Sequence, residues 1–393
     1  MVCGSRCFLG PVHEVRYTIA RSGSDSGMNP DVKTSRAGSL AGSPVPAGHR
    51  LLTGALLAVL VLVAGGCSTT SRASSSRPTS TATSSAQSMS ALTWSDLVSL
   101  VPNGRLDGVS CSSAKFCEAV GGKASNAGVA YRWNGTSWSS QSLPSRVGRL
   151  DGVSCFSVKF CEVVIGYSSF GTGALVWDGN SWSVQSIPSG ILGLNGVSCT
   201  SANSCEAVGS NSSSGVALGW NGTSWSTQSL PPGVSILNGV SCASPTSCEA
   251  VGSNSTSGVA LGWDGTSWST QGLPPGVSIL NGVSCASPTS CEAVGQTPSG
   301  GVALGWDGTS WSTQSLPSGV GWLYGVSCPL VHSCEAVGYN SSYSAGVALD
   351  WNSASWSTQS LPSGAQGLYG MSCPVPSFCT AVDSHGNATV ARS

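Results

Sequence analysis

Short segments in which apolar and polar residues alternate, separated by turn residues, follow one another from residue 91 to the C-terminus. In residues 237–273 these segments are LNGVSC, CEAVG, GVALGW and TSWSTQGL. The turn ASPTS separates the first two, and Asp264 and Gly265 between the last two are typical of a hairpin. No window shows a helical period. The stretch is therefore predicted to form four antiparallel strands.

Cysteine pairs show that this four-strand unit occurs seven times. The two cysteines of a pair are always six positions apart, and successive pairs begin 43 to 45 residues apart. Residues 232–251 and 275–294 are identical, as expected for recent duplicates. A period in the forties with strand-like content is typical of propeller blades. The pairs are Cys111/Cys117, Cys155/Cys161, Cys199/Cys205, Cys242/Cys248, Cys285/Cys291, Cys328/Cys334 and Cys373/Cys379.

The predicted fold is all-β: residues 91–393 form a seven-bladed β-propeller of four-stranded antiparallel blades. The last repeat ends at 388–391 without a fourth strand. Thr93-Trp94-Ser95 matches the missing strand, with one extra residue before the following Leu-Val-Pro. We therefore expect the N-terminal strand to close the ring, which removes open sheet edges. The expected oligomeric state is a monomer.

Alternation along the strands predicts which side chains face each other. If Cys242 lies opposite Cys248, then Val240 faces Ala250 and Ser241 faces Glu249. A disulfide that closes so short a loop should contribute about 2 kcal/mol in the chain-entropy model.

The N-terminal region is predicted to be a leader and a tether. Residues 1–66 contain the uncharged run LLTGALLAVLVLVAGG at 51–66, which is typical of a signal peptide and short for a membrane span. The translation start is either Met1 or Met28. Residues 67–90 are rich in Ser and Thr and are predicted to be a solvated linker.

Residues 64–67, Ala-Gly-Gly-Cys, resemble the lipobox of bacterial lipoproteins, which implies a lipid on Cys67. The expected location is extracytoplasmic: anchored to the outer face of the bacterial cell membrane, or secreted. An ordinary secretory leader and a retained anchor are the alternatives.

The tandem pattern W-[DN]-G-x-S-W combined with C-x5-C resembles secreted bacterial seven-bladed propellers of the broad sialidase and Asp-box type. The resemblance covers about residues 91–393. Asp264 and Gly265 are adjacent, whereas the Asp-box separates these two residue types. The resemblance therefore implies an architecture rather than an activity.

Candidate ligand-binding residues lie where the repeat varies, just before or within the first strand of each unit. By analogy with known propellers, this position faces the mouth of the central channel. An uneven rim is what a binding site on a symmetric scaffold requires, although drift of exposed loops produces one too. The candidates are Asp107, Asp151, Asn195, Asn238, Asn281, Trp322, Tyr324 and Tyr369, with the loop aromatics Tyr167, Phe170, Tyr339 and Tyr343 beside them.

Two repeated features have both a functional and a structural interpretation. A Glu on the second strand could form an acidic ring for a cation, but the favoured interpretation is a scaffold Glu that accepts a hydrogen bond from the facing Ser or from the next blade. Paired Trp residues at the third turn could stack on sugars, but blade packing is favoured. The Glu positions are Glu118, Glu162, Glu206, Glu249, Glu292 and Glu335, with Thr380 in the seventh unit.

Charge argues against nucleic acid as a partner. Only 8% of the residues are charged and the net charge is -1, so the chain lacks the basic face that nucleic acids require. Apart from Arg392, the basic residues of 91–393 lie between Arg105 and Lys159. This weak basic sector could contact anionic headgroups or cell-wall polymers.

Residues 91–393 contain few side chains in patterns typical of catalysis. Residues 91–393 contain two histidines, His332 and His385, in different units and without a nucleophile pattern. No metal site and no cofactor are expected. We predict a surface-anchored noncatalytic binding module of the cell envelope with a glycan or protein ligand. The alternatives are a glycoside-acting hydrolase or lyase that uses Asp107 and Asp151, and a structural envelope protein without a ligand.

Overall fold

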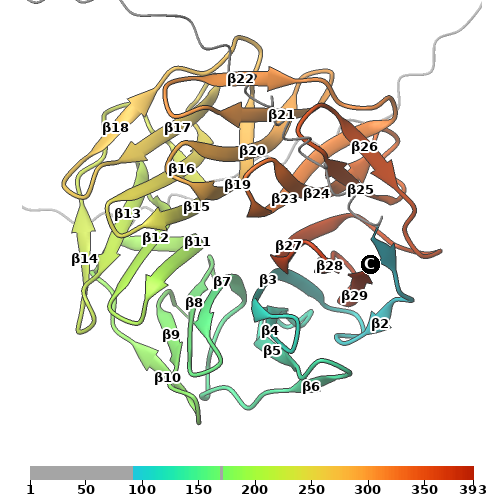
Figure 1. Ribbon diagram of the computed structural model, residues 1–393. Helices are drawn as coiled ribbons and strands as arrows, with labels where there is room; N and C mark the ends of the chain where they lie inside the picture. Colours follow the sequence, from blue (N-terminus) through green and yellow to red (C-terminus); the bar gives the residue numbers. More distant parts are fainter. Residues whose placement is uncertain (1–91, 169–170) are drawn as a thin grey trace, which may run out of the picture. The chain divides into compact units, whose positions relative to one another are not determined.

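The computed structural model describes residues 92–168 and 171–393, which form seven antiparallel sheets arranged as blades around a central channel (Figure 1). The predicted leader, Cys67, the linker and Phe170 lie outside the described residues. Within the described ranges, no helix has the length and apolar character needed to cross a membrane. The seven-bladed propeller predicted from the repeats is confirmed.

Each blade runs from an inner strand along the channel to an outer strand at the rim (Figure 1). The inner strands are β3 (Arg105–Ser113), β7 (Leu150–Ser157), β11 (Ile191–Ser201), β15 (Ile236–Ser244), β19 (Ile279–Ser287), β23 (Val320–Leu330) and β27 (Leu368–Val375). The second strands are β4 (Phe116–Gly122), β8 (Phe160–Ile165), β12 (Ser204–Asn211), β16 (Ser247–Ser253), β20 (Ser290–Thr297), β24 (Ser333–Asn340) and β28 (Phe378–Asp383).

The third and fourth strands complete the blades, which we number 1 to 7 from β3 onward. The third strands are β5 (Gly128–Trp133), β9 (Ala174–Trp177), β13 (Gly215–Trp220), β17 (Gly258–Trp263), β21 (Gly300–Trp306), β25 (Gly346–Trp351) and β29 (Asn387–Arg392). The fourth strands of blades 1 to 6 are β6 (Trp138–Ser140), β10 (Trp182–Gln185), β14 (Trp225–Gln228), β18 (Trp268–Gln271), β22 (Trp311–Gln314) and β26 (Trp356–Gln359).

The N-terminal segment supplies the outer strand of blade 7, as predicted. Strands β1 (Thr93–Trp94) and β2 (Val98–Ser99) both pair with β29. Trp94 lies opposite Ala391 and Val98 lies opposite Ala388, so the N-terminal side holds one more residue than its partner between these pairs. This is the extra residue seen in the sequence. The two ends of the described chain therefore share one sheet.

The predicted register and disulfides are confirmed. In blade 4, Cys242 pairs with Cys248, Val240 with Ala250 and Ser241 with Glu249. All seven predicted cysteine pairs form disulfides. Each one joins the end of an inner strand to the start of the second strand, which fixes the inner hairpin of its blade.

The second cysteine of every disulfide is buried, which the spacing of the pairs did not predict. These seven side chains are 0 to 3% exposed, and each belongs to a different apolar cluster of the core. Their role is therefore structural, as packing groups and as covalent links, and they are not accessible to a ligand. The buried cysteines are Cys117, Cys161, Cys205, Cys248, Cys291, Cys334 and Cys379.

Neighbouring blades interlock through large and small side chains. Val259 and Leu261 on the third strand of blade 4 belong to one buried cluster with Val208 and Ala217 of blade 3. On the other face of the same strand, Ala260 packs into the cluster of blade 5. The core is therefore a series of layers between blades.

A hydrogen-bonded chain of three side chains joins successive blades. Trp268 Nε1 in blade 4 donates to Gln228 Oε1 in blade 3 at 2.7 Å, and Gln228 Nε2 donates to Glu206 Oε1 at 3.1 Å. The same chain occurs in Trp311–Gln271–Glu249, Trp356–Gln314–Glu292 and Trp94–Gln359–Glu335. The repeated Glu and Trp residues therefore have a structural role in these blades.

The predicted partner of the repeated Glu was wrong. Glu249 accepts from Gln271 on the fourth strand of its own blade. Ser241 faces Glu249 in the ladder, but its hydroxyl accepts the backbone N–H of Cys285 in the next blade at 2.9 Å. The hydroxyl thus satisfies an inner-strand donor at the channel, where adjacent strands converge.

In blades 3 to 5 a glycine stands opposite the buried Glu and leaves room for the Gln, whereas in blade 6 Gln359 reaches Glu335 beside Asp350. A Cβ on Gly262 would lie 2.6 Å from Gln271 Nε2, so glycine leaves the space that the Gln–Glu hydrogen bond needs. In blade 2, Val176 fills this place and both carboxylate oxygens of Glu162 are buried without a partner. Burial raises the pKa of Glu162 to about 9.

Candidate functional site

The candidate residues at the start of the inner strands converge on one cavity. One residue from each blade lines a space of about 260 Å³ at one end of the channel, together with Arg105 and Arg149. The seven are Asp107, Asp151, Asn195, Asn238, Asn281, Tyr324 and Tyr369. We call this space the channel mouth.

A glycine follows each of these residues and allows the inner strands to approach. A Cβ on Gly239 would lie 3.1 Å from the carbonyl oxygen of Asn281 in the next blade. The inner strands therefore lie so close together here that the position after each candidate residue has little room for a side chain. The preceding residue then projects into the channel mouth.

Three amides form the middle of the rim. The Nδ2 atoms of Asn195, Asn238 and Asn281 each donate to the backbone oxygen of a leucine in the next blade at 2.8 to 2.9 Å. These bonds fix the orientation of each amide and link four inner strands. Among the described residues, no hydrogen bond occupies the Oδ1 atoms of Asn238 and Asn281, so they remain available as acceptors.

Two arginines and two aspartates form an ion-pair cluster on the next part of the rim. Arg149 binds Asp151 with two hydrogen bonds, at 2.7 Å from Nε to Oδ1 and 3.1 Å from Nη2 to Oδ2. Its Nε also lies 3.8 Å from Oδ2 of Asp107, and Arg105 pairs with the other oxygen of Asp107. The four side chains neutralise one another in charge while their polar atoms line the cavity.

The two carboxylates have different environments. Burial raises the pKa of Asp107 to about 6, although Arg105 and Arg149 lower it and Asp151 raises it further. The side chain of Asp107 is 7% exposed and that of Asp151 is 14% exposed. Asp107 therefore exchanges a proton near pH 6.

A glycine at the end of β4 and another directly after β8 make room for this cluster. A Cβ on Gly122 would lie 2.7 Å from Cγ of Arg149, so the arginine stem lies across blade 1 where that blade has no side chain. A Cβ on Gly166 would overlap the carboxylate of Asp151. Blades 3 to 6 have larger residues at this position, which confines the cluster to the first two blades.

Aromatic side chains complete the rim. The rings of Tyr324 and Tyr369 meet edge to face with centroids 4.9 Å apart, and Tyr339 contacts both at 6.0 and 6.3 Å. The guanidinium of Arg105 lies 4.7 Å from the ring centroid of Tyr369. The aromatic part of the rim is therefore continuous with the ionic part.

Trp322 does not line the channel mouth, unlike the other seven candidates. It is 36% exposed and contacts Tyr343 at 4.8 Å between ring centroids, and Tyr343 in turn contacts Tyr339 at 6.3 Å. Trp322 precedes Tyr324 by two residues and therefore lies farther out along β23. It extends the aromatic band away from the cavity. Tyr167 is exposed on blade 2 and makes no contact with this band among the described residues.

Sequence reasoning missed Arg105 and Arg149. Both stand two positions before the aspartate of their strand, which is also the position of Trp322 in blade 6. Residues two apart on a strand point to the same side, so comparing this second variable position between repeats would have identified both arginines.

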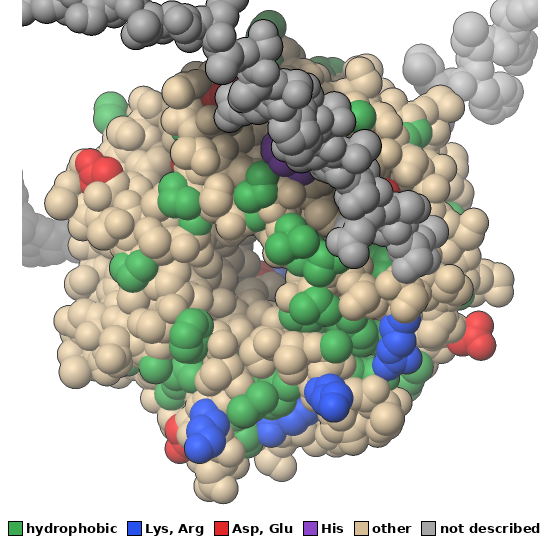
Figure 2. Space-filling view, viewed as in Figure 1, with side chains coloured by type: hydrophobic (Ala, Val, Ile, Leu, Met, Phe, Trp, Pro, Cys, Tyr) green, Lys and Arg blue, Asp and Glu red, His purple; other side chains and the backbone are tan. Residues whose placement is uncertain are grey.

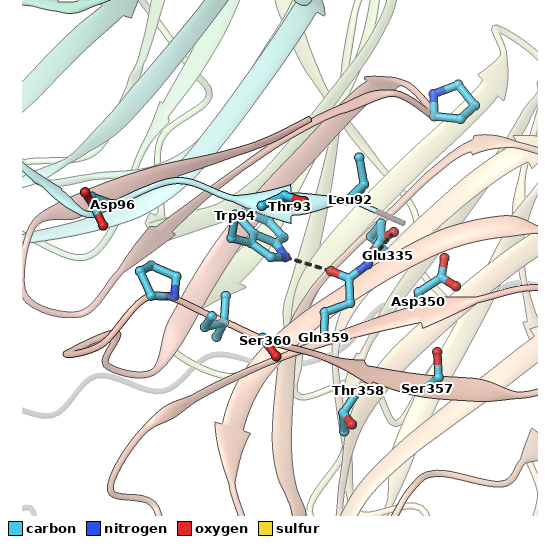
Figure 3. A pocket seen from close by; sticks show the side chains of 13 residues that line it. Leu92, Thr93, Trp94, Asp96, Glu335, Asp350, Ser357, Thr358, Gln359 and Ser360 are labelled. Carbon is cyan, nitrogen blue, oxygen red and sulfur yellow. Dashed lines mark hydrogen bonds between the residues drawn. The ribbon is translucent and has the colours of Figure 1, made fainter. Parts of the chain in front are cut away.

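A second cavity, of about 560 Å³, lies beside the ring closure (Figure 3). Trp94, Gln359, Glu335 and Asp350 line it, and Trp94 and Gln359 are joined by their hydrogen bond. Asp350 stands opposite Glu335, where blades 3 to 5 have glycine. Burial and the adjacent Asp350 raise the pKa of Glu335 to about 9, so this pair holds a proton at neutral pH.

Metal-binding clusters and free cysteines are both absent from the described ranges. Within residues 92–168 and 171–393, no three His, Cys, Asp or Glu side chains gather in an arrangement that could hold a metal ion. The cysteines of these ranges are engaged in disulfides, which indicates an oxidising compartment.

No protein-family model and no curated protein sequence matches the chain. Solved structures show the same fold at low identity. The structure described as YCF48 bound to D1 peptide has a TM-score of 0.56 and 14% identity, over 76% of this chain and 95% of that one. The WD40 propeller domain of Doa1 has a TM-score of 0.58 and 10% identity, over 77% and 97%. Catalytically inactive virginiamycin B lyase from Staphylococcus aureus with quinupristin has a TM-score of 0.61 and 9% identity, over 76% and 99%. The chain is thus similar to these proteins in its propeller architecture.

Proposed function

We propose that the chain is an extracytoplasmic, noncatalytic binding module that holds a glycan or protein ligand at the channel mouth. The observation that carries this proposal is the convergence of one variable residue from every blade on a single cavity. Packing within the blades requires the same residues in each repeat, whereas this position changes from aspartate to asparagine to tyrosine. A site specific for a ligand needs such asymmetry.

The chemistry of the rim favours a ligand with both polar and flat apolar parts. Amide oxygens and the Arg149–Asp151 pair can exchange hydrogen bonds with hydroxyl or peptide groups. Tyr324 and Tyr369 offer ring surface to a sugar or to an apolar side chain. In YCF48 a propeller of this architecture is bound to a peptide, which supports a protein ligand as one of the two classes.

The proposed location combines two observations. The seven disulfides indicate an oxidising compartment, and the sequence at 64–67 resembles a lipobox. A lipid on Cys67 would tether the propeller to the outer face of the cell membrane through the linker 67–90. Mass spectrometry of the membrane fraction tests this part, with Cys67→Ser as the unlipidated control.

The binding test uses the full chain carrying Cys67→Ser on a glycan array and against peptides from envelope proteins. A ligand found in this way should bind at least tenfold more weakly to Tyr324→Ala and to the double variant Arg149→Gln/Asp151→Asn. Lys159→Gln, a variant distant from the channel mouth, is the control. No ligand on either panel, or equal affinity for all variants, contradicts the proposal and favours a structural envelope protein.

A second candidate function rests on the unequal carboxylates. Asp107, with its pKa raised to about 6, would supply the acid, and Asp151, held by Arg149, would supply the second carboxyl group that a glycoside-acting hydrolase or lyase requires. Turnover on a panel of polysaccharides, abolished by Asp107→Asn and by Asp151→Asn, would establish this function in place of the first.

A further inference from the structure

In blades 2, 6 and 7, the turn between the first and second strands carries apolar side chains that are exposed to solvent. Phe156, Val158, Leu330, Val331 and Val375 are 53%, 52%, 54%, 45% and 40% exposed. They lie at the turns that follow the inner strands of these blades. The inner strands β23, β27, β3 and β7 lie side by side in this order, so these turns and that of blade 1 neighbour one another around the ring.

The same arc carries basic side chains. Lys115 and Lys159 stand in the corresponding turns of blades 1 and 2, and Arg392 at the end of β29 donates to the carbonyl oxygen of Gly135 in blade 1 at 3.1 Å. Figure 2 shows Lys and Arg side chains gathered over the part of the ring that contains β3 to β10 and β29. Two acidic side chains also belong to this arc: Asp178, in the hairpin that lies against Lys159, and exposed Asp96, which lines a cavity with Pro376 of the blade 7 turn.

The remaining blades differ at the same positions. The corresponding turns of blades 3 to 5 contain Ser-Ala-Asn-Ser, Ser-Pro-Thr-Ser and Ser-Pro-Thr-Ser. Of their outer hairpins, those of blades 4 and 5 carry Asp264 and Asp307, and none of the three carries a basic residue. Apolar and basic residues therefore coincide on one half of the face, and the scaffold does not require them, because the other blades fold without them.

The described chain begins on this same face. Thr93 pairs with Arg392 at the end of β29, and Leu92 and Pro376 of the blade 7 turn line one cavity. Ninety-one residues of chain precede this point and include the predicted linker. Leu92, the first described residue, therefore lies beside the turn of blade 7.

The channel mouth is at the opposite end of the inner strands. On β7, Asp151 is the second residue and Phe156 is next to last. On β27, Tyr369 is the second residue and Val375 is the last. Five or six residues of extended strand separate the two ends by about 17 to 20 Å.

We propose that the turns of blades 6, 7, 1 and 2 form a docking surface for an anionic lipid membrane. Phe156, Val158, Leu330, Val331 and Val375 enter the interface between headgroups and acyl chains while Lys115 and Lys159 contact the headgroup charge. The orientation that follows rests on the proposed lipid on Cys67: the membrane lies against this face, and the channel mouth points away from it. A ligand then approaches from outside the cell.

The test is cosedimentation of the full chain carrying Cys67→Ser with phosphatidylcholine vesicles, with and without phosphatidylglycerol. The protein should bind the anionic vesicles, and salt should weaken the binding. The double variant Lys115→Gln/Lys159→Gln should lower the partition coefficient roughly 10- to 30-fold, since each lysine near an anionic surface contributes about fivefold. Phe156→Ser/Leu330→Ser should also lower it at least tenfold.

The matched control is Tyr167→Ser/Val184→Ser, which removes two apolar side chains elsewhere that are even more exposed, at 76% and 59%. It should bind vesicles like the parent. Equal binding by all variants, or an equal loss in this control, overturns the proposal. A concentration-dependent dimer that the Phe156→Ser/Leu330→Ser variant abolishes also overturns it, because the surface would then join two copies.

The outcome is separable from that of the proposed function. Tyr324→Ala, at the channel mouth, should leave vesicle binding unchanged, and the turn variants should leave binding of a glycan or peptide ligand unchanged. If the ligand test fails while vesicle binding follows the turn variants, the docking surface stands without the proposed function.

Discussion

Trp94 and Gln359 are 265 positions apart in the sequence, yet the indole Nε1 of Trp94 donates to Oε1 of Gln359 at 2.7 Å (Figure 3). Gln359 Nε2 in turn donates to Glu335 at 3.2 Å. The ring is therefore closed by the same three groups that join blade 4 to blade 3. The only difference at the closure is that the outer strand of blade 7 comes from the N-terminal end of the described chain.

Trp94→Ala should destabilise the propeller by about 3 to 5 kcal/mol, because Trp94 is 7% exposed and its removal leaves a cavity and an unpaired glutamine. Chemical denaturation measures the loss. Trp94→Phe should cost about 1 to 2 kcal/mol, since it removes chiefly the hydrogen bond.

Trp182→Phe provides the matched comparison for this prediction. Trp182 occupies the same repeat position in blade 2 and is also buried, but its indole nitrogen has no hydrogen-bond partner among the described residues. Trp182→Phe should therefore lower the free energy of unfolding by less than Trp94→Phe does. An unfolding midpoint for Trp94→Ala equal to that of the parent would show that the N-terminal strand does not close the ring.

Gly262→Val should break the Gln271–Glu249 hydrogen bond, because the new side chain takes the space that Gln271 occupies. The expected loss is about 1 to 3 kcal/mol for a buried carboxyl left without its donor. The converse change, Val176→Gly, opens the equivalent space in blade 2 and should lower the pKa of Glu162 from about 9. NMR titration of the Glu162 carboxyl checks this shift, and an unchanged pKa would contradict the steric explanation.

The propeller should be more stable at pH 5 than at pH 8.5. Burial raises the pKa of Glu118, Glu206, Glu249 and Glu292 to about 7 and that of Glu162 to about 9, from 4.5. A raised folded-state pKa contributes stability that is fully present below about 4.5 and is lost as the pH rises through the folded value. The melting temperature should therefore fall by several degrees over this window, at about 1.5 °C per kcal/mol of lost stability for a domain of this size.

Glu162→Gln gives the control for the pH prediction. Its amide cannot ionise, so the variant should lose less stability than the parent between pH 7 and pH 9. A melting temperature that rises with pH in the parent would mean that the buried glutamates are ionised in the folded protein.

Removing one disulfide should cost about 2 kcal/mol, because the bond closes a loop between residues only six apart. Cys242→Ala/Cys248→Ala and Cys285→Ala/Cys291→Ala lie in two blades that share the same sequence around these cysteines. Their losses in the unfolding free energy should be equal within error. A much larger loss in either variant would mean that its disulfide also holds blades together.

Much of the fold could be predicted because the repeat shows the same strand pattern seven times. The alternation around Cys242 and Glu249 fixed the ladder, and the incomplete last repeat identified Trp94 as part of blade 7. The partner of Glu249 could not be predicted, since Gln271 reaches it across a third strand and only where Gly262 leaves room.

Part of the channel mouth could be predicted for the same reason. Residues that occupy one repeat position, such as Asp107 and Tyr324, must lie at one level of the ring. The roles of Arg105 and Arg149 depend on the space above Gly122 and on which neighbouring carboxylates they reach. Both the space and the carboxylates belong partly to a neighbouring blade, so the sequence of one repeat does not reveal these contacts.

The Trp–Gln–Glu chain also bears on how such a ring can change in size. Blades 3 to 6 each offer an indole donor on one flank and a glutamine acceptor on the other, so a duplicated unit of 43 residues from this part of the ring would meet its neighbours with groups they already accept. Gene duplication could thus insert or delete a blade without inventing a new junction, and only the curvature of the circle would have to adjust.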